Sequence, residues 1–357
     1  MSSESVRQRL KAPAVHVIDT EDGAILKRGC TELKIGGAGA AGTVRKVLAA
    51  TSAGGATSAE ICGLFVPSAA PLVRQLIEQL LARHFLVPVD EAESAADEAE
   101  SPLDIFYWHF GDKARQVAER LHKQSLVVLG VNCVSRQLAA SLSASGVENV
   151  RVWDHPRLRN RRFFDEAGKL KDGQWPASLP SPCEWTNEID PESLGCLIAS
   201  SDFGGWETLH EWNRFCVQYH KHFLPVVLQD LVGYVGPLVI PGETACLECV
   251  RMRRNSHAED HEARGLIEES AFEGQGAIGF HPSMASILGD IAAVELTKFY
   301  SGVLPSPKVG TLIEVNLLAT GLTSRKVLKA PRCPVCSPLL TRSSVSPDKA
   351  AVASSPG

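Results

Sequence analysis

Two Cys-x-x-Cys pairs, Cys246/Cys249 and Cys333/Cys336, restrict the possible folds of this chain more than any other feature of its sequence. Four thiolates offered as two chelating pairs match the tetrahedral all-cysteine sites that structural zinc occupies. The alternative is a redox pair, which normally lies at a strand-to-helix turn of a small βαβ domain, whereas these pairs are flanked by charged or Pro-rich sequence. We therefore predict a closed zinc site that joins distant segments and leaves no position open for a substrate.

Length and composition indicate a globular chain of two or three domains. It has 357 residues, of which 44% are hydrophobic and 22% are charged. No apolar run reaches the roughly 18 residues of a membrane-spanning helix, and residues 1–12 lack the apolar core of a signal peptide. We expect a cytoplasmic protein without membrane contacts, whose other six cysteines are reduced. The net charge of −5 argues against a nucleic-acid partner.

Composition shifts divide the chain. Residues 90–101 are acidic and rich in Ala and Ser, so they cannot bury enough apolar surface to fold and are predicted to be a linker. Residues 1–89 then form a first domain and residues 102–338 a second one. Residues 339–357 are rich in Ser, Pro and Ala and are predicted to be a disordered tail.

The first domain shows short strands followed by helices. A capping box at Thr57–Glu60 opens one helix, and apolar residues at helical spacing define another. The pattern predicts strands at 15–18, 24–27, 32–35 and 85–89, and helices at 43–50, after residue 57 and at 71–84. This order and size predict a winged helix-turn-helix.

A winged helix usually binds DNA, but the charges here favour a peptide. The expected recognition helix carries Arg74 and Arg83 against Glu78, so it is nearly neutral and cannot supply many phosphate contacts. Peptide capture needs no basic surface, because an extended peptide can add a strand to the edge at Thr31–Ile35. The candidate peptide-binding residues are Glu32, Leu33, Lys34 and Ile35 on this edge and Arg74 and Glu78 on the helix.

The second domain begins like a nucleotide-binding βαβ unit. An amphipathic helix at 103–122 precedes a buried parallel strand at 125–130, and a second strand ends in a carboxylate at Asp154. The phosphate-binding turn should read Gly-x-Gly-x-x-Gly, yet only Gly130 is present. Asn132 and Ser135 stand at the later positions, where their side chains would intrude on a phosphate. We therefore predict an α/β, Rossmann-like domain that has lost its phosphate cradle.

Further segments resemble a known superfamily. The strand-end Asp154, Asn160-Arg161, Asp202, Asn213-Arg214 and Pro241–Cys249 resemble the ThiF/MoeB-type, ubiquitin-activating-like superfamily over residues 120–340. The resemblance implies a fold whose members adenylate a carboxyl terminus, commonly hold a four-cysteine zinc and commonly pair as homodimers.

The C-terminal segments are more specific. Residues 280–286, 289–298 and 328–336 resemble the ThiF-like partner proteins of thiazole/oxazole-modified microcin pathways. In that family an N-terminal winged helix binds the leader of a ribosomally made precursor peptide. A separate YcaO-type cyclodehydratase then uses ATP to cyclise Cys, Ser or Thr onto the preceding carbonyl. The resemblance implies a precursor-leader partner, a YcaO partner and bacteriocin-type natural-product biosynthesis.

Two functional hypotheses follow. The first is a non-catalytic subunit that binds the leader, holds structural zinc and has no use for ATP. The second is an ATP-dependent adenylating enzyme, in which Asp154, Arg161 and Asp202 would contact ribose, triphosphate and magnesium. Each of these residues also has an ordinary structural explanation, as a strand-end cap or a surface charge. Because the glycine turn is degraded, we expect the first hypothesis to hold.

Overall fold

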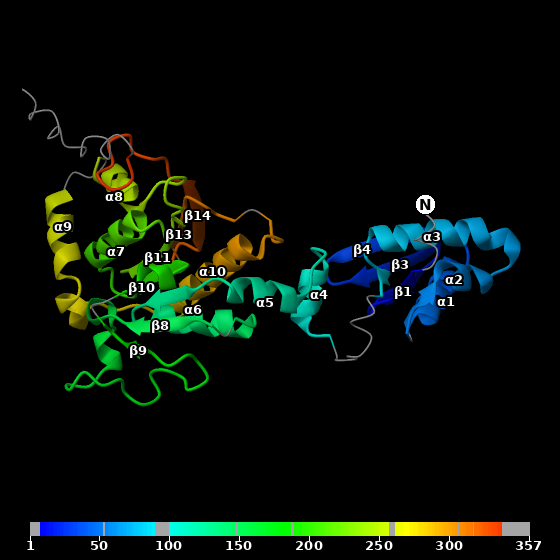
Figure 1. Cartoon of the computed structure of the whole chain (residues 1–357), viewed down its shortest axis with the longest axis horizontal. Coiled ribbons are helices and arrows are strands. Elements are labelled where there is room, and N and C mark those ends of the chain that lie inside the picture. The colour runs from blue at the N-terminus through cyan, green and yellow to red at the C-terminus, as the bar shows by residue number, and fades with distance from the viewer. Residues whose placement is uncertain are drawn as a thin grey trace, which may run out of the picture. The chain divides into compact units, whose positions relative to one another are not determined.

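A computed structural model gives the arrangement of the chain (Figure 1). It describes residues 8–52, 54–89, 100–147, 149–186, 189–256, 261–305, 307–316 and 318–337. The chain divides into two compact units, Met1–Ala114 and Arg115–Gly357. Most of the linker predicted at 90–101, and the whole tail predicted at 339–357, lie outside the described residues.

The first unit combines two small antiparallel sheets with short helices. Strand β4 pairs with β3 and forms one end of the sheet β2-β3-β4, and the second sheet has the order β5-β1-β6. The elements are β1 (Arg9–Lys11), β2 (His16–Thr20), β3 (Gly23–Arg28), β4 (Thr31–Gly36), α1 (Ala40–Ser52), β5 (Ala56–Thr57), α2 (Ser58–Gly63), η1 (Pro67–Ala69), α3 (Ala70–Ala82), β6 (Val87–Pro88) and α4 (Pro102–Trp108).

The local patterns of this unit are confirmed. The three strands expected before residue 36 are β2, β3 and β4, and the capping box is present, since Thr57 Oγ1 accepts the N–H of Glu60 at 3.2 Å. One apolar core joins strand and helices; its buried members include Leu26, Val44, Val47, Ile61, Val73, Leu76, Ile77, Leu80 and Phe85. Assignment of the unit as a winged helix-turn-helix remains a prediction.

The prediction of a single helix at 103–122 is wrong. Two helices occupy this stretch, α4 and α5 (Ala114–His122). Ser101 caps α4 by accepting the N–H of Asp104. Gly111 has a φ of +77°, a left-handed conformation that a continuous right-handed helix cannot include. The amphipathic pattern therefore continues across a turn that breaks the helix.

The second unit is built on an eight-stranded mixed sheet of order β14-β13-β12-β11-β10-β7-β8-β9, counted over the described residues. Neighbours from β11 to β9 are parallel, and β12, β13 and β14 extend the sheet in antiparallel fashion. The strands are β7 (Leu126–Leu129), β8 (Arg151–Asp154), β9 (Cys183–Glu184), β10 (Cys196–Ser201), β11 (His222–Gln229), β12 (Val232–Val235), β13 (Thr311–Asn316) and β14 (Gly321–Lys326). The chain runs from β7 outward to β8, then crosses back to β10, which makes the β7/β10 boundary the switch point where ligands of such sheets bind.

Helices cover both faces of this sheet. Helices α6 and α10 pack together and against β10 and β11, where Gly289 is required because a Cβ there would lie 2.7 Å from the backbone of Leu138. Opposite them, Val127, Leu129 and Leu197 pack with α7 and the cysteines. The helical segments are α5, α6 (Cys133–Ala144), η3 (Pro156–Leu158), η4 (Arg161–Phe163), η5 (Pro191–Ser193), α7 (Trp206–Gln218), α8 (Leu247–Asn255), α9 (His261–Ser270), η6 (Glu273–Ala277) and α10 (Pro282–Ser301).

The predicted α/β class with a Rossmann-type sheet is confirmed by this layering. None of the described helices combines the length and the apolar character that crossing a bilayer demands.

Candidate functional site

The four predicted zinc ligands lie together. Cys246 and Cys249 stand at the start of α8, and Cys333 and Cys336 lie in the turn that follows β14. Their Sγ atoms all lie within 4.8 Å of one another. The separations of 3.4 Å (Cys249–Cys336), 3.6 Å (Cys246–Cys333) and 4.0 Å (Cys246–Cys249) are far too long for disulfides.

This geometry fits zinc. Four sulfurs about 2.3 Å from a tetrahedral ion are separated by about 3.8 Å, close to the separations found here. The N–H of Ala330 donates to Cys249 Sγ at 3.3 Å, a contact that favours the thiolate of this cysteine. A thiolate is the form that binds the metal. The cluster is therefore consistent with a closed, structural zinc site.

The turn after β7 is closed by its own side chains. Asn132 caps α6, because its Oδ1 accepts the N–H groups of Val134 and Ser135 at 3.1 and 3.0 Å. Its Nδ2 donates to Ser200 O at 2.9 Å and to Leu158 O at 3.1 Å, so the amide fastens α6 to β10 and η3. The N–H groups that a nucleotide-binding turn directs at phosphate are thus occupied within the protein.

The glycine that remains in this turn has a structural explanation. Gly130 has a φ of +106°, and a Cβ there would lie 2.8 Å from Ser200 O and 2.9 Å from Leu158 O. Close approach of three backbone segments therefore requires glycine at this position whether or not a phosphate binds.

Asp202 completes the capped turn. Its Oδ2 accepts the N–H of Cys133 at 2.9 Å and Asn160 Nδ2 at 2.7 Å, and the side chain is buried. Its Oδ1 is buried without a hydrogen-bond partner among the described residues. Burial raises the pKa of this carboxyl above its usual value, against the lowering effect of the hydrogen bonds from Asn160 and Cys133.

Asp154 and Arg161 have other partners. Asp154 forms a bidentate ion pair with Arg159, with Nε–Oδ1 and Nη2–Oδ2 distances of 2.6 and 2.8 Å. The Arg161 guanidinium lies 3.3 Å from the exposed carboxylate of Glu273. The three residues nominated for adenylation therefore have three different sets of protein partners.

The proposed peptide edge has two kinds of side chain. Leu33 and Ile35 pack against the core, whereas Glu32 and Lys34 are exposed, with Glu32 ion-paired to Lys27 at 2.9 Å. Arg74 and Glu78 are exposed on α3.

Two residues near the turn after β7, Arg159 and Gln275, are not indicated by the sequence analysis. Arg159 neutralises Asp154, and Gln275 hydrogen-bonds the backbone beside Asn160. The glycines on both sides of Gln275 mark it in the sequence, but nothing in the local pattern indicates its distant partner.

Solved structures share this architecture over most of the chain. MccB of E. coli in complex with ATP matches with a TM-score of 0.64 and 16% identity, over 92% of this chain and 100% of MccB. The chain has a ThiF/MccB-like fold. A heterocyclase in complex with substrate and cofactor shares this ThiF/MccB-like fold, with a TM-score of 0.58 and 20% identity, over 92% of this chain but 40% of the heterocyclase. The heterocyclase TruD matches similarly, with a TM-score of 0.60 and 18% identity, over 92% of this chain and 43% of TruD.

The sequence itself has a weaker relative. Protein HesA of Leptolyngbya boryana is 25% identical over 154 residues, which are 42% of this chain. The match spans about half, 49%, of HesA. No family model matches the chain.

Proposed function

We propose that this protein is a non-catalytic, leader-binding subunit. Its first unit, as a winged helix, captures the leader of a ribosomally made precursor peptide, and the protein presents the peptide core to a separate YcaO-type cyclodehydratase that forms azoline rings. The ThiF/MccB-like unit is the scaffold, and zinc held by the four cysteines joins its α8 to its C-terminal turn.

The occupied turn after β7 carries this proposal. Asn132 and Asp202 take the first N–H groups of α6, and Arg159 takes the carboxylate of Asp154. An adenylating site needs free N–H groups for phosphate and a free carboxylate for ribose. Because the protein itself uses both, recognition of peptide without nucleotide is the function that fits best.

The edge of β4, with which no described strand pairs, supports peptide capture by strand addition. Arg28 and Thr31 close a two-residue turn and therefore form a hydrogen-bonded pair. Alternation along β4 then directs the backbone N–H and C=O groups of Glu32, Lys34 and Gly36 away from β3. A leader segment that adds as a strand would bond to these three residues.

The structurally similar proteins support a peptide ligand for this chain. MccB has been solved with MccA, and a heterocyclase has been solved with substrate. This chain spans 40% of that heterocyclase. In this proposal, ring formation is the task of the YcaO-type partner.

The test is binding of the precursor leader to the full-length, zinc-loaded protein, with and without Mg·ATP, alongside ATP–pyrophosphate exchange. We expect the same leader affinity in both conditions and no exchange. Ring formation on the precursor should require addition of the YcaO protein. Exchange of pyrophosphate by this chain alone would refute the proposal.

Adenylation of a peptide carboxyl or amide is the second candidate. It is favoured by the unpaired, buried Oδ1 of Asp202 and by the match to all of ATP-bound MccB. On this hypothesis Asp202→Asn would abolish pyrophosphate exchange. The same variant would leave leader affinity unchanged under the first hypothesis.

A further inference from the structure

Helix α4 belongs to the first unit, although it follows the predicted linker. Arg28, on β3, has a side chain that is 2% exposed, and its guanidinium makes a bidentate ion pair with Glu100 at 2.8 and 3.0 Å. The same guanidinium donates to Ala14 O at 2.8 Å, and its Cζ lies 4.8 Å from the ring centroid of Trp108. Because a buried cation is costly to leave unpaired, these contacts fasten residues 100–108 to the hairpin of β3 and β4.

The C-terminal end of α4 joins the start of β4 to the end of α3. Trp108 Nε1 donates to His84 O, just beyond α3, at 3.0 Å. Thr31, the first residue of β4, has its Oγ1 2.6 Å from His109 Nδ1, a hydrogen-bond distance. Gly111 then ends the helical segment in a left-handed conformation. The side chains at the end of α4 are therefore held beside β4 (Figure 1).

One face of α4 carries aromatic side chains. Phe106, His109 and Phe110 have the i, i+3, i+4 spacing of a single helix face, and we call them the α4 aromatic face. The ring centroids of Phe106 and Phe110 are 5.4 Å apart, and those of His109 and Phe110 are 4.8 Å apart. Phe106 is nevertheless 47% exposed. Because His109 contacts Thr31, this face adjoins the edge at which we propose that the leader binds.

The alternation of β4 places the α4 aromatic face beside the inward side chains of an added strand. Thr31, Leu33 and Ile35 are half-buried on the core side of the sheet, and the residues between them are exposed on the other side. A peptide strand paired with β4 alternates in the same way, so its residue opposite Thr31 directs its side chain to the core side. There that side chain meets His109 and the rings next to it.

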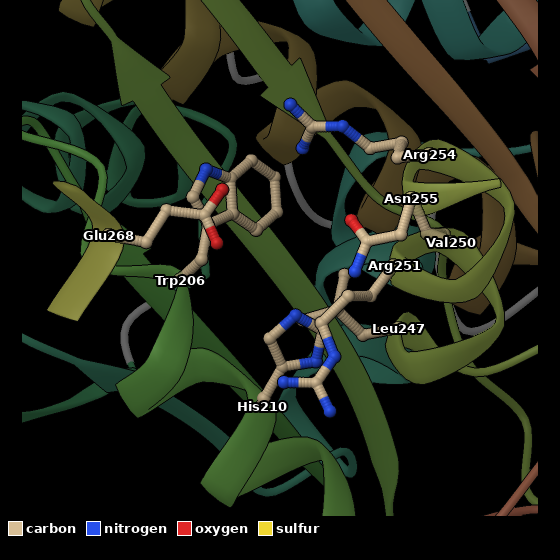
Figure 2. Close-up of a pocket in the computed structure, with 8 residues that line it drawn as sticks. All are labelled: Trp206, His210, Leu247, Val250, Arg251, Arg254, Asn255 and Glu268. Carbon is tan, nitrogen blue, oxygen red and sulfur yellow. The ribbon is translucent and has the colours of Figure 1, made fainter. Parts of the chain in front are cut away.

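The hollow between α7, α8 and α9 is different, because its arginines already have partners (Figure 2). Arg251 lies 2.8 Å from Glu248 and 3.4 Å from Glu207. The Cζ atom of Arg254 lies 5.1 and 5.2 Å from the centroids of two aromatic rings. These cations are engaged within the second unit, whereas Phe106 stands exposed.

We propose that the α4 aromatic face is part of the leader site and binds a bulky apolar side chain of the leader. The inference rests on the proposed function, since it takes strand addition to β4 as its starting point. The leader then carries apolar residues at alternate positions, opposite Ile35, Leu33 and Thr31, and the residue opposite Thr31 is large enough to cover Phe106. This contact removes from water the aromatic surface that α4 exposes.

The probe is an octapeptide taken from a random display library by selection on the full-length, zinc-loaded protein. Counter-selection against Lys34→Pro, which lacks one outward N–H of β4, retains the peptides that pair with this edge. The retained peptides are synthesised with a fluorescein label and titrated by fluorescence anisotropy. We expect their sequences to alternate apolar and polar residues, with an aromatic or large aliphatic residue at one end.

Phe106→Ala should weaken the retained peptides by roughly tenfold, because aromatic residues of an interface carry much of its binding energy. Phe106→Leu keeps a large apolar side chain and should bind nearly as well as the native protein. Tyr219→Ala is the matched control, because Tyr219 is 43% exposed and packs on one neighbouring ring in the second unit. Its affinity should stay within about twofold of the native value.

A double-mutant cycle identifies the partner of Phe106 in the peptide. Alanine at the terminal apolar residue of the peptide should weaken binding to the native protein and have little further effect on Phe106→Ala. Independent, additive losses would show that the two side chains do not meet and would overturn the inference.

The other outcomes separate this inference from the proposed function. Equal affinity of Phe106→Ala and the native protein would overturn the inference and leave strand addition in place. If no peptide survives the counter-selection, strand addition itself is contradicted, and the inference falls with it. A lower mass of peptide-free Phe106→Ala in light scattering would assign the aromatic face to a contact between copies of the chain and would overturn its role in the leader site.

Discussion

Asn132 stands where a nucleotide-binding turn needs a small residue, and its amide supports three segments at once. Asn132→Ala removes the cap of α6 and leaves Ser200 O and Leu158 O without their donor. We expect the free energy of unfolding to fall by about 2–4 kcal/mol, from the lost cap and the lost buried hydrogen bonds. Urea denaturation would measure it, with Asn149→Ala on the surface as the control. A change within about 0.5 kcal/mol would contradict the role assigned to this residue.

Cys333 offers a direct test of the metal centre. Cys333→Ser should lower the bound zinc measured by elemental analysis. It should also lower the Tm of the protein by roughly 6–12 °C, which corresponds to about 3 kcal/mol for a domain of this size. Cys183→Ser is the control, because Cys183 is exposed and lies outside the cluster. An unchanged melting curve for Cys333→Ser would argue against structural zinc.

His155 makes stability depend on pH. Burial, and then Arg157 and Arg159, lower the pKa of this histidine to about 4 in the folded protein, below its ordinary value of 6.5. The unfolded chain therefore binds one more proton between these pH values, and stability falls by about 1.4 kcal/mol per pH unit as the pH drops through that range. His155→Asn can still accept the N–H of Arg157 but cannot be protonated. Urea midpoints at pH 7 and pH 5 should differ less for the variant than for the native protein, and equal differences would exclude this origin.

Single residues were predictable from sequence only where chemistry recurs at fixed spacing. The two Cys-x-x-Cys pairs predict that the four cysteines share one site. Asn132, at a position where a phosphate-binding turn has glycine, indicates that this turn is lost. The pairing of Asp154 with Arg159 was not foreseen, because a charge near a strand end does not reveal which way it turns. Gln275 lies 114 residues from its partner Arg161, and no local pattern encodes such a contact.

At the scale of elements, β4 is where a bound leader should be detectable. Lys34→Pro removes one outward backbone donor and places a ring where an added strand would lie, while an edge strand tolerates proline on that side. We expect leader affinity to fall by roughly tenfold or more. Lys34→Ala keeps the N–H and should bind the leader nearly as well as the native protein. Equal losses in the two variants would point to the lysine side chain instead of strand addition.

The long strands can be predicted from their runs of apolar residues, whereas the shortest strands cannot. Strands β7, β10 and β11 are continuous apolar runs and were expected from them. Strands β1, β5 and β9 have two or three residues each and exist through pairing with distant segments. Apolar periodicity predicts one helix across α4 and α5, because it does not detect the left-handed conformation of Gly111 that separates them.

At the scale of the whole molecule, the proposed leader-binding edge and the four-cysteine cluster belong to different compact units. Removal of zinc with a chelator should therefore lower the Tm while leaving leader affinity within about twofold, since each unit has its own core. Calorimetry and peptide titration on the same samples would check both quantities. Joint loss of stability and affinity would show that the peptide site depends on the second unit.

Zinc bound by the four cysteines would also impose an order of events on synthesis. Its ligands Cys246 and Cys333 are 87 residues apart, so the first pair leaves the ribosome well before the second pair exists. At about 5–20 residues per second, this interval lasts roughly 4–17 s. During that time Cys246 and Cys249 are a half-built chelate, open to oxidation or to the wrong ion. If zinc occupies the cluster, the nascent chain would need a reducing, zinc-supplied environment until Cys333 and Cys336 have been synthesised.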